Sequence, residues 1–352
     1  MVNMSTCLRP FQWVRKGEQV ALSGKTQVFG HPMIISRTPL RISIGGGGTD
    51  LPSYYEKHGG FVISAAISKY IYILLNRAYK DGYYLKYSKI ESVETVDQIA
   101  HPLIREALRA HNIQTGIEVV SVADIMAGTG LGSSSAFTVG FLNTLRAFKR
   151  QPVSTEALGQ EAGDLEMIKL GEPVGKQDHY IAAYGGITCQ EYRPDGSVGI
   201  TPLHVSDTTL SDLSDGLMLF FTGTSRSAST LLADQKKRSE SDDKSIIENL
   251  HFIKDLGYRI KAVLEAGKTD EFGRLMHEHW EMKRKRNAGM SDPFIDKAYA
   301  HALANGAIGG KLVGAGGGGF LMFFTNDRKR LRHAMAELNL EEMPFDFDFH
   351  GS

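Results

Sequence analysis

The sequence predicts an α+β fold, in which strands and amphipathic helices are both frequent along one chain of 352 residues. Apolar residues alternate over short runs such as 33–44, whereas longer stretches such as 246–266 repeat them at helical spacing. Glycine, with 38 residues, is concentrated in three clusters between such runs. The length allows two domains or one large one, and the apolar content of 42% can fill a sizeable core; we place two domains at residues 33–210 and 211–352.

The overall charge and composition exclude several classes of protein. Lys+Arg and Asp+Glu both number 40, so nothing in the net charge favours nucleic acid or an anionic membrane as a partner. No apolar run is long enough to span a membrane. The two cysteines, Cys7 and Cys189, argue against a disulfide framework and suit a reducing cytoplasm. The oligomeric state stays open, and a homodimer is one of the states that the sequence allows.

The N-terminal 32 residues differ from the rest because they are mixed in character and show little periodicity. They also lack the charged start, apolar block and cleavage site of a signal peptide. We expect residues 1–32 to be a leader or an upstream extension outside the fold.

A strand over residues 33–44 is expected first, and Pro39 makes it an edge or interrupted strand. It runs into the first glycine cluster, residues 45–50, where Thr49 and Asp50 offer polar contacts to a ligand. A flexible turn with Asp50 as a helix cap is the alternative. The next expected elements are a helix over 54–60, one or two strands over 61–75, a strand over 83–89, a helix over 101–111 and a strand over 117–122.

The central stretch, residues 126–136, places three glycines and three serines between that last strand and a helix over 136–149. Glycine lets backbone amides approach a ligand closely, and a helix that starts at the serines points unpaired N–H groups back into the loop. Such a site binds anions, phosphate above all, and Ser133 and Ser134 could add hydrogen bonds or hold Mg²⁺. An ordinary helix start with a serine cap is the alternative. The stretch is neither a Walker A loop nor a GxGxxG fingerprint.

Asp178 is a further acidic residue, after Asp50, that is a candidate for the site. A helix over 157–168, capped by Ser154 and carrying Glu166, is ended by Pro173 and Gly175. Asp178 then lies at or just inside the start of a new helix, where the helix dipole stabilises a carboxylate as the anion. A purely structural N-cap is the alternative.

The C-terminal part contains the third glycine cluster, residues 314–319, which suggests another close backbone approach to a ligand or else a loose hairpin. Arg226 lies in a hydroxyl-rich turn and could grip a phosphate or simply be solvated. The histidines of the helix over 269–286 do not match the HExxH zinc signature, and the basic run 283–286 could face a phosphorylated ligand. The other expected elements are a hairpin over 188–203, strands over 216–221, 308–313, 320–324 and 343–349, and helices over 246–266, 293–305 and 327–338.

The order of the three clusters resembles the GHMP kinase family, and the likeness covers nearly everything from residue 33 onward. Arg37-Thr-Pro-Leu-Arg-Ile-Ser, Gly46-Gly-Gly-Thr-Asp-Leu-Pro-Ser-Tyr-Tyr55, Gly175-Lys-Gln-Asp178 and Tyr184-Gly-Gly are similar to one branch of that family. Members of that branch phosphorylate the anomeric hydroxyl of D-glycero-D-manno-heptose 7-phosphate, toward nucleotide-activated heptose. The resemblance implies a ribosomal-protein-S5-domain-2-like N-terminal domain and a ferredoxin-like C-terminal domain, with ATP and Mg²⁺ as cofactors.

The resemblance also implies roles for individual residues. Asp178 matches the catalytic aspartate, and Arg41 occupies the position of the basic residue beside it. Ser134 matches the Mg²⁺-binding serine, and Glu166 the glutamate that completes that site, although this chain has one more residue between Glu166 and Asp178 than mevalonate kinases have. The residues implied to wrap the ATP phosphates are Gly128, Thr129, Gly130, Leu131, Gly132, Ser133, Ser134 and Ser135. Those implied to contact the substrate are Gly47, Gly48, Thr49, Asp50, Gly316, Gly317 and Gly318, with Arg226, Lys283 and Arg284 as candidates for the 7-phosphate.

Three other functions remain open at this stage. The chain could be another GHMP sugar kinase, such as a fucose-type C1 kinase, or a non-catalytic sensor of sugar and ATP on the same fold. A nicotinamide-dependent oxidoreductase ranks last, because the glycine loop lacks the fingerprint spacing and the acidic partner about 20 residues on. The sequence also leaves open whether Asp178 is a true base or only orients the hydroxyl.

Overall fold

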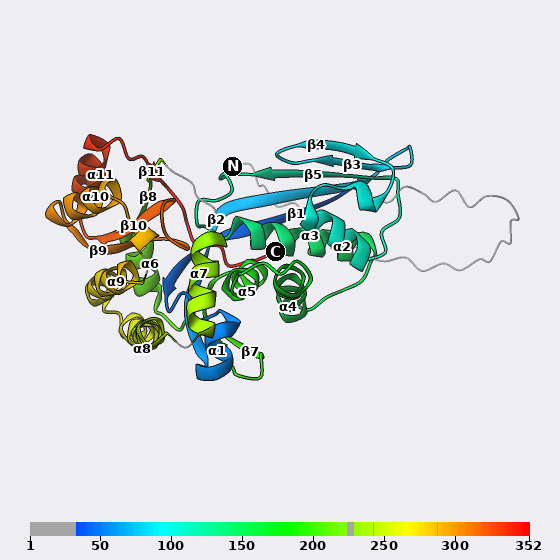
Figure 1. Ribbon diagram of the computed structural model, residues 1–352. Coiled ribbons are helices and arrows are strands. Elements are labelled where there is room, and N and C mark those ends of the chain that lie inside the picture. The colour runs from blue at the N-terminus through cyan, green and yellow to red at the C-terminus, as the bar shows by residue number, and fades with distance from the viewer. Residues whose placement is uncertain (1–32, 224–228, 242, 287) are drawn as a thin grey trace, which may run out of the picture. The chain divides into compact units, whose positions relative to one another are not determined.

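The larger of two β-sheets is organised on β2 (Gly60–Arg77), a long strand that uses both of its edges (Figure 1). β1 (Ile34–Gly45) pairs antiparallel along one edge, while β5 (Ile117–Ala123) and β6 (Ile187–Tyr192) share the other. Outside these lie β3 (Tyr83–Lys86), β4 (Ile90–Val93) and β7 (Val198–Pro202). This computed structural model describes residues 33–352 apart from 224–228, 242 and 287.

Pro39 has the effect on β1 that the sequence indicates. β1 pairs with β2 alone in the described chain, and the register of that pair shifts between Pro39 and Leu40. Because proline cannot donate to a ladder, an edge strand is where it is tolerated. β1 is buried continuously from Thr38, just before the shift, to Gly45, which fixes Arg41 and Ser43 in the interior.

Helices cover one face of the larger sheet. α3 (Ser133–Phe148) packs on β1 and β2, and α4 (Thr155–Asp164) and α5 (Gln177–Tyr184) lie beside it (Figure 1). The aromatic side chains Phe137 and Phe141 of α3 are buried in the same core as the alternate β2 residues Ile63, Ala65 and Ile67. This burial holds the N-terminal end of α3 in a fixed place relative to β1. Two further helices of this part of the chain are α1 (Pro52–His58), between β1 and β2, and α2 (Pro102–Ala110), before β5.

The smaller sheet has the strand order β11-β8-β10-β9 and is entirely antiparallel. Side chains of β8 (Leu217–Phe221) alternate between its faces: Leu217 and Leu219 join the core shared with the larger sheet, whereas Met218 and Phe220 join a second cluster. α9 (Thr269–Arg284), α10 (Pro293–Ala304) and α11 (Arg328–Glu337) contribute to that second cluster. The other elements here are α6 (Asp207–Gly216), α7 (Ser229–Glu240), α8 (Lys244–Glu265), β9 (Ala307–Leu312), β10 (Phe320–Thr325) and β11 (Glu342–Met343).

This succession includes the strand–helix–strand–strand–helix–strand pattern of the ferredoxin-like motif, in agreement with the expected fold. Two local expectations were wrong. α6 occupies residues 207–216, at the expected domain boundary, where no element was expected, and β11 is only two residues long instead of spanning 343–349. Phe347 instead forms a bridge with Ile67 of the larger sheet, and Asp348 bonds the backbone of Ala66 and Gly186. The division into domains at residue 210 stays a prediction.

Membrane insertion through a helix has no support in the described residues, since none of their helices combines the length and apolarity that a bilayer span needs.

Candidate active site

The middle glycine cluster forms a tight loop that ends in helix α3. Gly128, Gly130 and Gly132 have φ angles of 80°, 82° and 76°, a region that residues with a Cβ adopt only under strain. Gly132 is the N-cap of α3, and Ser133 begins the helix. The first amide groups of the helix have no partner within it and lie where Gly132 to Ser135 line a cavity. This end of α3 therefore suits an anion.

The third glycine cluster packs directly on this loop. A Cβ added at Gly314 would lie 2.5 Å from the Cα of Gly130, and one added at Gly319 would lie 2.2 Å from the carbonyl oxygen of Thr129. Backbone thus packs on backbone, and no side chain could fit between the two loops. The hairpin between β9 and β10 closes one side of the cavity, where Gly314 and Ala315 line it.

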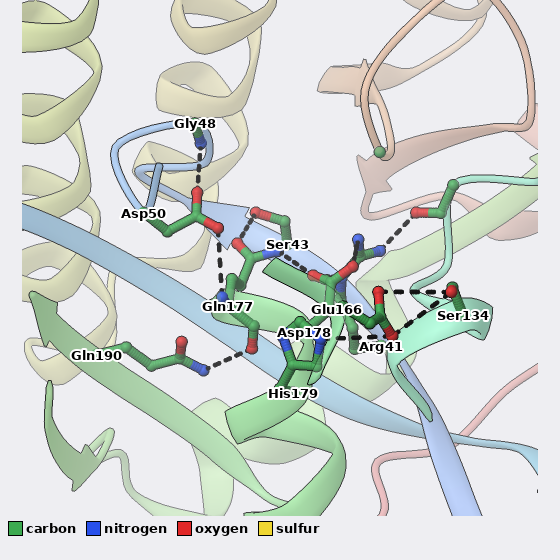
Figure 2. Close-up of polar contacts among 12 residues, drawn as sticks. Arg41, Ser43, Gly48, Asp50, Ser134, Glu166, Gln177, Asp178, His179 and Gln190 are labelled. Atoms are coloured by element: carbon green, nitrogen blue, oxygen red, sulfur yellow. Dashed lines mark hydrogen bonds and ion pairs between the residues drawn. The ribbon is translucent and has the colours of Figure 1, made fainter. Parts of the chain in front are cut away.

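Arg41 and Asp178 meet beside the loop (Figure 2). The Nε and Nη2 atoms of Arg41 donate to the two carboxylate oxygens of Asp178 at 2.7 and 2.6 Å, and its Nη1 donates to the carbonyl oxygen of Gly130. Burial alone would raise the pKa of Asp178, but the guanidinium of Arg41 outweighs it and holds the pKa below its ordinary value. Asp178 is accordingly an anion at neutral pH.

Glu166 approaches the start of α3 from a π-helical turn, η2 (Leu165–Lys169), that follows α4. Both of its carboxylate oxygens lie 3.5 Å from Ser134 Oγ, and Thr138 Oγ1 donates to one of them at 2.5 Å (Figure 2). His179 lies 3.5 Å away on the other side. Burial lowers the pKa of His179, but Glu166 and Asp178 raise it by more, so the pKa is above its ordinary value. A π turn commonly marks a functional position, and here it orients the carboxylate toward the loop.

Ser134 and Glu166 fit the needs of Mg²⁺, because this ion takes oxygen ligands and is usually held by one or two protein groups together with phosphates and water. No group of three or more His, Cys, Asp or Glu residues in the described part of the chain could hold a metal by itself.

The first glycine cluster adds a supporting network. Asp50 accepts hydrogen bonds from the backbone N–H groups of Gly48 at 3.0 Å and Gln177 at 3.2 Å, so it links this loop to the start of α5 (Figure 2). The side chain of Gln177 accepts from Ser43 Oγ and donates to Asp178, each at 2.9 Å. Burial, and next the charge of Asp178, raise the pKa of Asp50. The loop thereby sets the position of the carboxylate at residue 178.

Thr49 was expected to contact the substrate, but it does not line the cavity. Its side chain is completely buried, its hydroxyl donates to the carbonyl oxygens of Gly46 and Phe61, and it accepts from the Phe61 N–H. Because the hydroxyl is buried, does not line the cavity and uses its single hydrogen on these carbonyl oxygens, its role in this structure is to hold the loop.

Three buried cations form another wall of the cavity. Lys283 of α9, Arg286 just after it and Lys311 of β9 all line the cavity and are 8%, 5% and 2% exposed. Burial is the main cause that lowers the pKa of Lys283 to about 7 and that of Arg286 to about 10. It also places the pKa of Lys311 well below its ordinary value.

The cavity that these groups share has a volume of about 890 Å³. Its other end is largely apolar and is lined by Ile71, Tyr87, His101, Leu103 and Phe137. A second hollow of about 980 Å³, near α6 and α11, contains none of the predicted site residues. The predicted residues that line the cavity are Arg41, Gly47, Gly48, Asp50, Gly128, Gly130, Gly132, Ser133, Ser134, Ser135, Glu166, Asp178 and Lys283.

Several predicted residues are not brought to the cavity. Thr129 and Leu131 are buried beneath the loop, and Gly316 to Gly318 lie behind Gly314 and Ala315 in the hairpin, with the Gly317 N–H bonded to Met290. Arg284 points elsewhere and pairs with Glu281 and Asp296. Arg226 lies outside the described residues.

Sequence reasoning missed Lys311 as a member of the site, and it included Arg286 only as part of the basic run 283–286, without singling it out. The basic run 283–286 indicated the end of the helix but not which of its side chains turn inward. Lys311 carried a clearer signal, since a lone lysine within the buried strand 308–313 needs a functional or structural partner.

Two family models match this chain. The model of the GHMP kinases N terminal domain matches residues 94–186, and that of the GHMP kinases C terminal matches residues 260–341. The first match includes the loop at 128–135 and Asp178, and the second includes Lys283 and Lys311.

Individual proteins are similar over most of the chain. A D-glycero-alpha-D-manno-heptose 7-phosphate kinase of Campylobacter jejuni is 27% identical, over 90% of this chain and 96% of its own length. A bifunctional fucokinase/GDP-fucose pyrophosphorylase of Arabidopsis thaliana is 26% identical over 88% of this chain, which spans 31% of that larger protein. Among solved structures, a D-glycero-D-manno-heptose 1-phosphate kinase from Bacteroides thetaiotaomicron superposes with a TM-score of 0.75 at 26% identity, covering 91% of this chain and 97% of the other.

Proposed function

The chain belongs to the GHMP kinase family and is an ATP-dependent phosphotransferase with an alcohol group as acceptor, and on that premise we propose that its acceptor is the C1 hydroxyl of D-glycero-D-manno-heptose 7-phosphate. The product is the 1,7-bisphosphate. The proposal rests most on one observation: Asp178 shares a single cavity with the anion-binding loop at residues 128–135. The names of the similar proteins from Campylobacter jejuni and Bacteroides thetaiotaomicron support a heptose phosphate, although they differ in where its phosphate stands.

The loop and the start of α3 hold the ATP phosphates. Phosphoryl transfer depends on in-line positioning and on stabilisation of charge more than on covalent help. Backbone N–H groups at residues 128–135 and the hydroxyls of Ser133 and Ser134 supply hydrogen bonds to phosphate oxygens. Ser134 and Glu166 would hold Mg²⁺, which when bound neutralises charge on the phosphates. Thr138 keeps the Glu166 carboxylate turned toward that position.

Asp178 orients the acceptor. Its carboxylate accepts a hydrogen bond from the C1 hydroxyl and so directs the oxygen at the γ-phosphorus. Because Arg41 lowers the pKa of Asp178, the carboxylate is a weak base before the reaction begins. It takes the proton late, when the new bond to phosphorus has made the hydroxyl acidic. Arg41, which also contacts Gly130, stabilises negative charge that develops between the two substrates.

A fucose-type C1 kinase is the second candidate. Fucokinases of Arabidopsis thaliana and Bacteroides fragilis are each 26% identical to this chain, close to the value for the heptose kinase. The intact pair of Arg41 and Asp178 disfavours a sensor without activity.

A substrate panel tests the proposal. ADP release is measured with heptose 7-phosphate, mannose 6-phosphate, fucose, galactose and mevalonate, and the product is located by ³¹P NMR. We expect the highest kcat/KM for heptose 7-phosphate and a new phosphate at C1. A higher kcat/KM for fucose would establish the second candidate, and turnover of no sugar would contradict both.

A further inference from the structure

We propose that Lys283, Arg286 and Lys311 form a binding site for the acceptor's own phosphate, the one that is not transferred. This inference rests on the proposed function, because it assigns a place to a group that only a sugar phosphate carries. The site consists of three side chains, which come from α9, from the residues just after it and from β9.

Among the described residues, the three basic side chains have no carboxylate beside them to balance their charge. In the described part of the chain no carboxylate oxygen lies within 4.0 Å of the nitrogen atoms of these three side chains. Asp50 is the one carboxylate that raises the pKa of Arg286, and its own pKa is raised by burial. Basic groups that are buried without a counter-charge hold their protons less firmly, and an anion bound in the cavity would favour their charged forms, so their presence around a cavity indicates an anionic ligand.

The guanidinium of Arg286 has hydrogen-bond donors that the described residues leave unused. Arg286 Nε donates to Asn249 and its Nη1 donates to Gln235, each at 3.1 Å, which fixes the guanidinium. Its Nη2 is buried and has no partner among the described residues. An arginine held at two nitrogens with the third free is preorganised for an oxyanion.

The two lysines also keep a donor each. Lys283 Nζ donates to the carbonyl oxygens of Leu312 and Gly314, and Lys311 Nζ donates to that of Ile44 and contacts His279 Nδ1. An ammonium group has three N–H donors, so one remains on each lysine. The pKa of His279 is well below its ordinary value, because of burial and then the nearby lysines, so this imidazole is neutral and adds no charge.

The position of the cluster suits the far end of a sugar phosphate. A Cβ added at Gly48 would lie 2.6 Å from Arg286 Nη1, so Arg286 stands against the first glycine loop. Ser43 and Gln177 lie in the chain of contacts from that loop to Asp178. The cluster therefore lines the same cavity as Asp178 and makes none of its hydrogen bonds, so both can contact one ligand.

Gln235 of α7 connects these parts. It donates to the carbonyl oxygen of Gly48 at 3.0 Å and accepts from Arg286, so α7, the first glycine loop and the residue after α9 are held together. A phosphate bound at Arg286 would thus act, through Gln235, on the first glycine loop. Asp50 of that loop accepts a hydrogen bond from Gln177, the residue before Asp178.

Binding measured without turnover tests the inference. The Asp178→Asn variant serves as the background, and calorimetry measures its affinity for heptose 7-phosphate, mannose 6-phosphate, mannose and inorganic phosphate. Adding Arg286→Met to this background should weaken the binding of both sugar phosphates by roughly 10- to 100-fold, the usual loss for a hydrogen bond to a charged group. The affinity for ATP should stay unchanged. Arg284→Met, two residues away and paired at the surface, is the matched control and should change neither.

Lys311→Met provides a second variant in case Arg286→Met does not fold. Removing a buried cation should raise or preserve the thermal midpoint of the free protein while it weakens the sugar phosphates. A purely structural role for Lys311 would lower that midpoint and leave the affinity alone.

Two results would overturn the inference: tighter binding of mannose than of mannose 6-phosphate, or an Arg286→Met effect that falls on ATP instead of the sugar phosphate. Neither depends on catalysis. If sugar phosphates bind through Arg286 but no phosphoryl transfer occurs in the wild type, the proposed function fails while this inference stands.

Discussion

Arg41 and Asp178, which are 137 positions apart in the sequence, form a two-pronged ion pair with distances of 2.7 and 2.6 Å. The pair joins β1 of the larger sheet to the first turn of α5 and touches the loop that precedes α3 through Gly130. The side chain of Gln177, which accepts a hydrogen bond from Ser43 Oγ, also donates to the carboxylate of Asp178. The arrangement fixes both the charge and the direction of Asp178.

Asp178→Asn should keep the fold and lose activity by about 10²- to 10⁴-fold in kcat, because asparagine keeps the shape but cannot take the proton. ADP release gives the rate, circular dichroism checks the fold, and ATP binding serves as the control. Activity near that of the wild type would remove Asp178 from the mechanism.

Glu166→Gln should raise the Mg²⁺ concentration needed for half-maximal rate by at least about tenfold, because the amide is a poorer ligand than the carboxylate. The measurement is a Mg²⁺ titration at fixed ATP. Glu156→Gln, at an exposed position in the first turn of α4, is the control and should leave the titration unchanged. An unaltered titration in Glu166→Gln would show that the metal is held elsewhere.

Gly132→Ala and Gly171→Ala form a matched pair. Both glycines have positive φ angles, 76° and 70°, so each alanine should cost about 1–2 kcal/mol of stability. A Cβ at Gly132 would lie 3.1 Å from Arg41 Cγ and 3.2 Å from Asp178 Oδ2, whereas one at Gly171 has nothing within 4 Å. We expect similar midpoints in urea but a large loss of kcat only in Gly132→Ala. Equal activity in the two variants would mean that the loop tolerates displacement of the ion pair.

Thr49 distinguishes a sugar contact from a loop-holding residue. Thr49→Val should lower the free energy of unfolding by about 1–3 kcal/mol, because the buried Phe61 N–H loses its acceptor. Thr49→Ser keeps the hydroxyl and should bind the sugar phosphate with the wild-type KM. If Thr49→Val raised KM strongly at unchanged stability while Thr49→Ser did not, a direct contact of the hydroxyl with the substrate would be indicated.

Lys283 should make stability depend on pH. The charged groups that face it are Arg286, Arg41 and Lys311, and His279 lies beside it; burial is the largest cause of its pKa of about 7. Between about pH 7 and its ordinary pKa of 10.5, the unfolded chain binds a proton that the folded chain has lost. Its contribution to the free energy of unfolding therefore rises as pH rises through this window.

The test of this dependence compares the wild type with Lys283→Met in urea at several pH values from about 7 to 9, so that contributions common to both cancel. The stability of the variant relative to the wild type should fall as pH increases. A difference that is independent of pH would show that Lys283 keeps its ordinary pKa.

The sequence alone determined the family, the mixed α and β fold and the class of reaction, and the comparisons confirm these three. The reason is that glycines in loops and apolar periodicity are local features, and each reports on a few consecutive residues. The edge position of β1 could likewise be predicted from Pro39 alone.

Only the tertiary structure decided which polar groups face the cavity. Thr49 and Asp50 are neighbours in the sequence. Yet the hydroxyl of Thr49 bonds to backbone atoms, whereas the carboxylate of Asp50 joins the first glycine loop to the start of α5. Likewise, Arg284 turns to surface carboxylates while Arg286 turns inward. The direction of a side chain depends on packing against other segments, such as Gln177 for Asp50 and Asn249 for Arg286, and no local pattern of residues encodes it.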